Sequence, residues 1–311
     1  MKTDVAILFV IVFFLKQGLV RPEIIGAVVL PHGGIALDPS HFKTTNKTSL
    51  AQAWEIHNAC MKAGKLIEGL KPDLILLSTP HGVADQTNFQ FYLNSKGFGS
   101  TDTDNCACPP CCYNVSVDLD QNVSKDLVIE LKAMSRNVSG LVGFGDAVPF
   151  PLAWGEVIPL HFLLGGARVV VLSQPNRRYT DSVQMIPELL EMGTSLFSVL
   201  ESSNLKVVVA ISADLAHTHD HNGPYGYSNA SQPFDDALGK WAESLDSQAL
   251  LHTAASLVDR ALSCGFTGLV MLHGLMESIG LKFWTSELLV NHHPSYYGMI
   301  VATFLKTVLN N

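Results

Sequence analysis

Two stretches of the 311-residue chain share one pattern: GAVVLPHGG at 26–34 and LILLSTPHG at 74–82. In each, a continuous apolar run ends in a Pro-His-Gly turn. A run that is apolar at nearly every position predicts a strand buried on both faces, as in parallel sheets. Proline fixes one backbone dihedral, and glycine lets the backbone pass close to a ligand. Such a turn can therefore aim the imidazole of His32 or His81 rigidly.

Further apolar runs and helical periodicities extend this pattern along the chain. Buried strands are expected at 169–173 and 207–212. The spacing of apolar residues predicts helices at 49–70, 123–135 and 181–202, and further helices from about 233 to 280. Two closing strands are expected near 282–290 and 296–304. Strands that alternate with helices predict an α/β fold, with a largely parallel or mixed central sheet flanked by helices. No linker divides the chain, so 21–311 is expected to form a single domain.

Residues 85–122 interrupt the α/β pattern. They are rich in Asn, Asp, Gly, Ser and Cys, and we expect a long excursion around one hairpin near 89–93. Thiols that lie close together in an oxidising compartment are expected to pair as local disulfides; the candidates are Cys106, Cys108, Cys111 and Cys112. A zinc site is the alternative, although the cluster lacks two separated C-x-x-C halves.

The N-terminus predicts export. Residues 5–15 read VAILFVIVFFL, with Lys2 before the run and Lys16 after it. The run is shorter than the about 20 residues that cross a bilayer, and it is typical of a signal-peptide core. We expect residues 1–20 to be a signal peptide that sends the protein to the secretory pathway or the cell exterior. An uncleaved signal anchor that tethers the protein to a membrane is the alternative.

Sequons and composition agree with an exported globular protein. N-glycosylation candidates lie at Asn46, Asn114, Asn122, Asn137 and Asn229. With 47% hydrophobic residues, the chain can bury a core, so disorder is excluded as its main state. The net charge is −8 and no Lys/Arg cluster is visible, which argues against nucleic acid as a partner. No membrane span is expected beyond the leader, and the sequence leaves a homo-oligomer open.

Histidines follow three of the predicted strands: His32, His81 and His217. Ligands bind outside the carboxyl ends of strands in open α/β sheets, so these imidazoles are expected to converge. A single histidine after a strand is more often a loop residue with one hydrogen bond. Two matching Pro-His-Gly turns favour a common site.

The string from His217 to His221, HTHDH, has a second interpretation. It is similar to the H-x-H-x-D-H pattern of β-lactamase-type metallo-hydrolases, but one residue is missing between the second His and the Asp. Because of this missing residue, the side chains of Asp220 and His221 would point in directions other than those of the metal ligands in that pattern. His219 is therefore expected at the mouth of a pocket rather than on a metal ion.

Five blocks together carry a family resemblance: GAVVLPHGG (26–34), LILLSTPHG (74–82), VVVAISADLAHTHDHNGPYGY (207–227) with PFDDAL (233–238), ALSCGFTGLVMLHGLM (261–276) and HPSYYGMIVATF (293–304). The chain resembles the class III extradiol ring-cleavage dioxygenases, the protocatechuate 4,5-dioxygenase beta-like superfamily, and its Memo-like relatives. The resemblance implies a non-haem Fe(II) centre, with another divalent metal as an alternative. His32 and His81 occupy positions of metal ligands, and His217 occupies the position of the acid/base residue.

The third metal ligand departs from the ring-cleaving pattern. Those members use a Glu, whereas the corresponding region here reads Leu262-Ser263-Cys264-Gly265. Memo-like relatives place a Cys in this region, so Cys264 is the candidate, with Asp259 and Glu277 nearby as alternatives. A thiolate in place of a carboxylate would change the metal preference.

The implied activity is insertion of both atoms of O2 into a small catecholic substrate, with cleavage of the ring beside its hydroxyls. Asp214 is expected either to orient His217 or to cap the following helix. Pocket residues are expected to include His219, Tyr225 and Tyr227. The alternative is a Memo-like metal-binding protein that acts by partner binding or redox chemistry without ring cleavage.

Overall fold

The computed structural model describes residues 23–145, 147–163 and 165–307. The strands are β1 (Glu23–Leu30), β2 (Leu74–Thr79), β3 (Phe89–Tyr92), β4 (Lys96–Thr101), β5 (Tyr113–Asp118), β6 (Val138–Leu141), β7 (Phe150–Leu152), β8 (Arg168–Ser173), β9 (Lys206–Ser212), β10 (Trp284–His292) and β11 (Met299–Lys306). The helices are α1 (Lys47–Leu70), α2 (Gln121–Ala133), α3 (Trp154–Leu163), α4 (Ile186–Leu200), α5 (Ser231–Ser244), α6 (Val258–Ala261) and α7 (Phe266–Ile279). Shorter helical turns are η1 (Gly34–Ala36), η2 (Pro39–His41), η3 (Asn176–Tyr179), η4 (Ala249–Ala254) and η5 (Leu281–Phe283).

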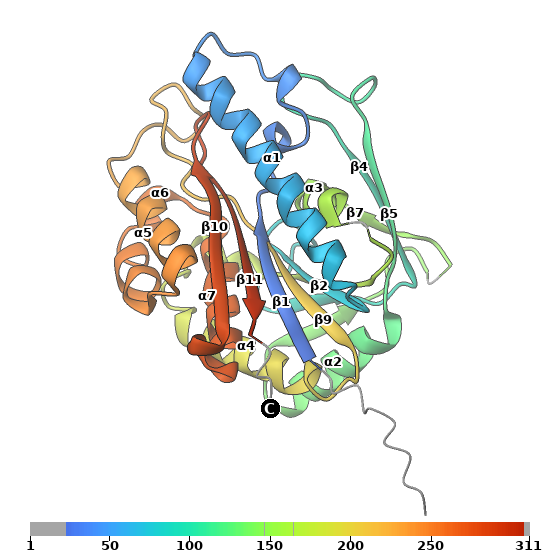
Figure 1. Cartoon of the computed structure of the whole chain (residues 1–311). Coiled ribbons are helices and arrows are strands. Elements are labelled where there is room, and N and C mark those ends of the chain that lie inside the picture. The colour runs from blue at the N-terminus through green and yellow to red at the C-terminus, as the bar shows by residue number, and fades with distance from the viewer. Residues whose placement is uncertain (1–22, 146, 164, 308–311) are drawn as a thin grey trace, which may run out of the picture.

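A mixed sheet of eight strands forms the centre, in the order β10-β11-β1-β9-β2-β8-β3-β6. The middle strands β1, β9, β2 and β8 run parallel to one another. The closing strands β10 and β11 are antiparallel and extend one edge of the sheet. This arrangement, with helices packed against the sheet (Figure 1), is the α/β fold that the strand pattern predicts.

Side chains of the central strands alternate between two cores. In β2, Leu74 and Leu76 join the core beneath α4 and α7, whereas Ile75 and Leu77 join the core beneath α1 and α3. Strand β9 alternates in the same way. A strand with apolar neighbours on both faces needs apolar residues at every position, which explains the continuous runs in the sequence.

Local sequence sets the ends of several elements. The side chain of Asn46 accepts hydrogen bonds from the backbone N–H groups of Thr48 and Ser49 and so caps the start of α1. The predicted helix at 181–202 begins later, at Ile186, directly before Pro187. The predicted helical span 233–280 is divided, because Leu245 and Leu262 adopt left-handed backbone conformations that end α5 and α6.

The prediction for residues 85–122 was wrong in its central element. No hairpin forms at 89–93, because β3 pairs with β6 and β8 in the main sheet. The hairpin is β4–β5, which belongs to a separate three-stranded sheet with β7. The burial pattern of β4 alternates between exposed and buried, with Gly97 and Gly99 at inward positions. Glycines at these positions hide the apolar alternation that marks a strand.

The cysteine cluster forms two local bridges, Cys106–Cys111 and Cys108–Cys112. The predicted disulfides are thus present in the structure. The predicted leader at 1–20 lies outside the described residues. All five sequon asparagines are exposed. None of the helices in the described part of the chain combines the length and apolar character of a bilayer-spanning helix.

Candidate metal centre

Three adjacent strands deliver the candidate residues to one edge of the sheet. Strand β9 lies between β1 and β2, and all three are parallel. His32 follows β1, His81 follows β2, and the segment from Asp214 to His217 follows β9. Because parallel strands end at the same edge, these residues meet there, as the sequence pattern predicts.

Three side chains form a compact ligand-type cluster: His32, His81 and Cys264. One ligand atom of each lies within 4.8 Å of the others. Cys264 Sγ is 3.2 Å from His32 Nε2. The rings of His32 and His81 are edge to face, with centroids 4.6 Å apart. The structure therefore brings the two turn histidines and the predicted cysteine together.

Cys264 reaches the cluster because its loop passes very close to the end of β9. The N–H of Gly265 donates a hydrogen bond to the carbonyl of Asp214. A Cβ on Gly265 would lie 2.6 Å from Ala213 Cβ and 2.7 Å from the Asp214 carbonyl oxygen, so a larger residue would push the loop away. The Ser263 hydroxyl donates to the same carbonyl.

His81 is held from the opposite side by the first turn of α3. A Cβ on Gly155 would lie 2.7 Å from Thr79 Oγ1 and 2.8 Å from His81 Cβ. The indole of Trp154 packs against the His81 ring, with centroids 5.1 Å apart. This contact leaves His81 little rotational freedom.

A hydrogen-bonded chain orients His32. Its Nδ1 lies 2.9 Å from Ser212 Oγ, and the Ser212 hydroxyl donates to the carbonyl of Gly155 at 2.6 Å. Since the serine proton is committed to that carbonyl, His32 Nδ1 is the donor toward Ser212. The lone pair then lies on Nε2, the nitrogen that faces Cys264.

Burial sets the protonation of this cluster. It lowers the pKa of His32 well below its usual value, and the charges of His81 and His217 add to the effect. Burial likewise lowers the pKa of His81 to about 3. Both imidazoles are therefore neutral at physiological pH and can act as ligands. Burial also raises the pKa of the Cys264 thiol, so the sulfur keeps its proton unless a cation stabilises the thiolate.

The carboxylate of Asp214 contacts His32 rather than His217, and it caps no helix. Its Oδ1 accepts from the backbone N–H of His32 at 3.1 Å, and its Oδ2 lies 3.3 Å from His32 Nε2. Both expectations for this residue were therefore wrong, because residues 213–230 form no helix directly after β9. Burial raises the pKa of Asp214 to about 8.

His217 lies beside the cluster with a defined tautomer. Its Nδ1 donates to the carbonyl of Leu262 at 2.8 Å, and its backbone N–H donates to Ala261. The left-handed conformation of Leu262 ends α6 at this point. The Nε2 atom of His217 thus carries the lone pair. Burial lowers the pKa of His217, which keeps the ring neutral.

A cleft of about 290 Å³ opens over the cluster. A second cavity of about 190 Å³ adjoins it and shares His81, His217 and Tyr225 with it. Volumes of this size suit a small ligand. Aromatic rings supply much of the wall of the cleft: Trp154, Tyr225, Tyr296 and Tyr297.

Two predicted pocket residues point away from the cleft. His219 Nε2 bonds to Asp235 Oδ2 at 2.7 Å, and its ring stacks on His293. Tyr227 stacks on His221. Neither His219 nor Tyr227 lines either cavity in the described structure, because each is drawn into these other contacts. Tyr225 does line both.

The alternative third ligands also lie elsewhere. Asp259 borders the second cavity and accepts a hydrogen bond from Ser182, but it does not belong to the ligand cluster of the described residues. Glu277 pairs with His273 on α7. Of the three candidates, Cys264 alone joins the two histidines in the described part of the chain.

Several site residues were not foreseen. Trp154, Tyr296, Tyr297 and Asp104 line the cleft, and Arg178 lies behind it. Tyr296 and Tyr297 fall within the HPSYYG block, so that block carried a usable signal. Trp154 and Arg178 lie far in the sequence from any such block, and only the fold brings them to the site.

The chain belongs to the family described as the catalytic LigB subunit of aromatic ring-opening dioxygenase, whose model matches residues 26–302. Protein CA_C1420 of Clostridium acetobutylicum is 25% identical over 230 residues. That match covers 70% of this chain and 45% of the relative, so the chain spans less than half the length of that curated protein. An uncharacterized protein of Escherichia coli K12, JW3007, shares the fold with a TM-score of 0.51 at 14% identity, over 90% of this chain and 99% of that chain.

Members of this family typically depend on a metal, and the donor set here fits one. Two neutral imidazoles offer nitrogen lone pairs, and one thiol offers sulfur, all within 4.8 Å. Nitrogen and sulfur donors suit divalent ions of intermediate softness. A cation would also stabilise the thiolate of Cys264, which is otherwise disfavoured by burial.

Proposed function

We propose that this protein is a metal-dependent extradiol dioxygenase, in which His32, His81 and Cys264 hold one Fe(II) ion and a small catechol is the substrate. The observation that carries the proposal is the convergence of these three ligand atoms within 4.8 Å, on the fold of a ring-opening dioxygenase family. When bound, a ferrous ion would acidify the catechol hydroxyls and activate O2 beside the substrate.

His217 supplies the proton transfer in this proposal. Its Nδ1 is committed to the Leu262 carbonyl, so Nε2 is free to accept a phenolic proton. Its lowered pKa keeps this nitrogen unprotonated at neutral pH. After it accepts the proton, the Leu262 carbonyl continues to hold Nδ1–H, and the ring keeps its orientation for return of the proton.

The cleft walls favour a flat, apolar ring with polar substituents. The ring of Tyr297 stacks nearly parallel to His217, with centroids 6.0 Å apart. Trp154 and Tyr225 are 49% and 58% exposed, which places large apolar surfaces at the mouth where a ligand would cover them. Packing of the substrate ring between these side chains excludes water from the reacting groups.

The thiol at position 264 favours a second candidate function. Thiolate donors shift preference toward zinc or copper, away from the two-histidine, one-carboxylate face of non-haem iron oxygenases. A Memo-like metal-binding protein without ring cleavage therefore remains the alternative. It predicts metal binding at the same three residues but no oxygen consumption with catechols.

We further propose that the protein works in the secretory pathway or outside the cell. The two local disulfides and the five exposed sequons support this location. A membrane tether through an uncleaved leader is the alternative, and mass spectrometry of the secreted chain would distinguish them by its first residue and its glycans.

The activity is tested by anaerobic loading with Fe(II), followed by oxygen uptake and product absorbance with a panel of catechols. The proposal expects stoichiometric oxygen consumption and a ring-opened product from at least one catechol. Bound metal with no product from any catechol would favour the alternative function. Failure of the protein to bind metal would contradict both.

A further inference from the structure

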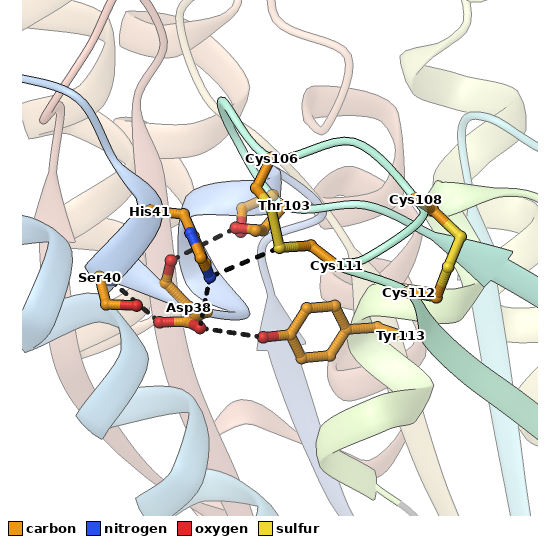
Figure 2. The surroundings of a disulfide bond; sticks show 10 residues. Asp38, Ser40, His41, Thr103, Cys106, Cys108, Cys111, Cys112 and Tyr113 are labelled. Atoms are coloured by element: carbon orange, nitrogen blue, oxygen red, sulfur yellow. Dashed lines mark hydrogen bonds and ion pairs between the residues drawn. A yellow bond between two sulfur atoms is a disulfide. The ribbon is translucent and has the colours of Figure 1, made fainter.

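A second cluster of ligand-type side chains, here called the rim cluster, consists of His41, Cys106 and Cys111. It lies near the cleft, since Cys106 is two residues from Asp104, which lines the cleft. His41 of η2 lies beside the Cys106–Cys111 disulfide, and atoms of these three residues lie within 4.8 Å of one another. Figure 2 shows the imidazole pointing toward both Cys111 and the carboxylate of Asp38. The cluster stands apart from the metal centre described above and plays no part in the proposed reaction.

We propose that reduction of the Cys106–Cys111 disulfide creates a second metal site, in which His41, Cys106 and Cys111 hold a zinc-type divalent ion. Two thiolates and one imidazole supply three donors of a tetrahedral site. Asp38 lies outside the 4.8 Å group, but its Oδ2 is 3.5 Å from His41 Nε2, which makes it the carboxylate for the fourth position if it moves toward the ion. In the disulfide form the two sulfurs are bonded to each other and the site is closed.

Distances in the structure already match part of this geometry. His41 Nε2 lies 3.4 Å from Cys111 Sγ and 3.5 Å from Asp38 Oδ2. In a tetrahedral zinc site with ordinary bond lengths, an imidazole nitrogen and a thiolate sulfur lie about 3.5 Å apart, and nitrogen and oxygen lie about 3.3 Å apart. Opening the disulfide to about 3.8 Å between the sulfurs gives the separation of two thiolates on one such ion.

The ligand positions are anchored independently of the disulfide. Asp38 is fixed by a hydrogen bond from the Ser40 N–H and by another from the Tyr113 hydroxyl. Thr103, three residues before Cys106, donates through its hydroxyl to the carbonyls of Gly34 and Asp38. These contacts keep the two segments together when the sulfur–sulfur bond opens.

The second bridge is the natural comparison within the same segment. Cys108 and Cys112 do not belong to the His41 cluster in the described structure. Figure 2 shows their bridge on the far side of Cys111 from His41. The proposal therefore assigns the site to Cys106 and Cys111 alone, and not to four sulfurs of a zinc knot.

The redox step balances with a dithiol reductant. Its two thiols give up two electrons and two protons as they form their own disulfide, and Cys106 and Cys111 become thiols. The mixed disulfide with one of these cysteines is the intermediate. On metal binding, the two thiol protons pass to solvent and two thiolates bind the ion. Cys106 and Cys111 are partly exposed, so a reductant can reach them.

The experiment titrates Co²⁺ into full-length Cys264→Ser protein and follows the thiolate-to-cobalt charge-transfer absorption. The Cys264→Ser background removes the thiolate of the cleft, and the remaining free thiol, Cys60, is fully buried in the core, so the signal reports the cysteine-rich segment. Oxidised protein is expected to show no such band. Protein reduced with a phosphine under argon is expected to show a band that saturates at one Co²⁺ per chain and is displaced by Zn²⁺.

Variants in the same background locate the ligands. Cys106→Ser/Cys111→Ser is expected to abolish the band, and His41→Ala is expected to weaken Co²⁺ affinity at least about tenfold. The matched control Cys108→Ser/Cys112→Ser is expected to keep it. His41 is 41% exposed in its side chain, so its replacement leaves the core intact. The proposal is overturned if reduction produces no band, if His41→Ala binds Co²⁺ like its parent, or if the control pair also loses the band.

Discussion

Two clusters in this molecule combine imidazole with sulfur, and they differ in burial and in the number of sulfurs. In the cleft, His32 and His81 follow buried strands, and Cys264, in the loop between α6 and α7, is only 4% exposed. At the rim, His41 and the cysteines of the Cys106–Cys111 bridge are partly exposed. A single buried thiol has no second sulfur with which to form a disulfide and stays free to bind a cation, whereas two neighbouring, partly exposed thiols oxidise to a disulfide.

The comparison teaches that donor type alone does not define a metal site. The cleft cluster is rigid because β1, β9 and β2 fix its backbone, with Ser212 and Gly155 orienting His32. The rim cluster lies on a loop and a short helical turn, where a change of redox state can rearrange the ligands. We therefore expect constitutive metal binding in the cleft and conditional metal binding at the rim.

The largest expected effect separates the two clusters directly. In the oxidised protein, His32→Ala should lower metal affinity by more than about a hundredfold, because it removes one of three ligands at the cleft. The matched variant His41→Ala should leave affinity unchanged. Isothermal titration with Fe(II) or Co²⁺ under argon measures both. Equal losses in the two variants would show that the clusters are not independent.

His217→Ala tests the division between metal binding and proton transfer. We expect turnover of a catechol to fall by about 10²- to 10⁴-fold, the usual contribution of a general acid/base, while metal stoichiometry is unchanged. His221→Ala is the control, since His221 stacks on Tyr227 outside the cleft. Loss of metal from the His217→Ala protein would mean that His217 is a ligand.

A smaller effect is expected from the serine that orients His32. Ser212→Ala removes the acceptor of the His32 Nδ1 proton and should weaken metal affinity by about 10- to 100-fold. Ser212→Thr retains the hydroxyl and should recover part of that affinity. Metal titration of both variants checks this order, and an unaffected Ser212→Ala would show that packing alone orients the ring.

The smallest effect concerns Glu156, which is fully buried in the helix that supports His81. Burial raises its pKa from 4.5 to about 7. Between these values the folded protein holds a proton that the unfolded chain releases, so stability falls as pH rises, by up to about 3 kcal/mol. Glu156→Gln should reduce the difference in unfolding free energy between pH 5 and pH 8. Urea denaturation at both pH values measures it, and an unchanged difference would contradict the assignment.

The sequence predicted the central sheet and two metal-ligand candidates for a physical reason. Strands buried on both faces are apolar at every position, and the Pro-His-Gly turns after β1 and β2 repeat the same local chemistry. The strand β4 escaped notice, because Gly97 and Gly99 replace the apolar residues that mark a strand. The strand β7 is only three residues long and contains Pro151, so it carries no strand pattern either. Long-range packing placed Trp154 and Arg178, and no local pattern reports such contacts.

Cys264 and Asp214 show, within the site, the same limit of what local sequence patterns can predict. Cys264 was a candidate only because the chain resembles a known family, since a lone cysteine after a helical segment carries no local signal. Neither expectation for Asp214 named its hydrogen-bond partner His32, because the two residues lie 182 positions apart in the sequence. The pairing of the four clustered cysteines was also beyond the reach of spacing alone.

The central claim, that Cys264 completes a metal site with His32 and His81, is tested most directly by Co²⁺ titration of the oxidised protein. Its rim cysteines are then held as disulfides, so a thiolate-to-cobalt band reports the remaining free thiols, Cys60 and Cys264. We predict a band that saturates at one Co²⁺ per chain, is kept in Cys60→Ser and is lost in Cys264→Ser. An unchanged band in Cys264→Ser, or no band in the parent protein, would contradict the account.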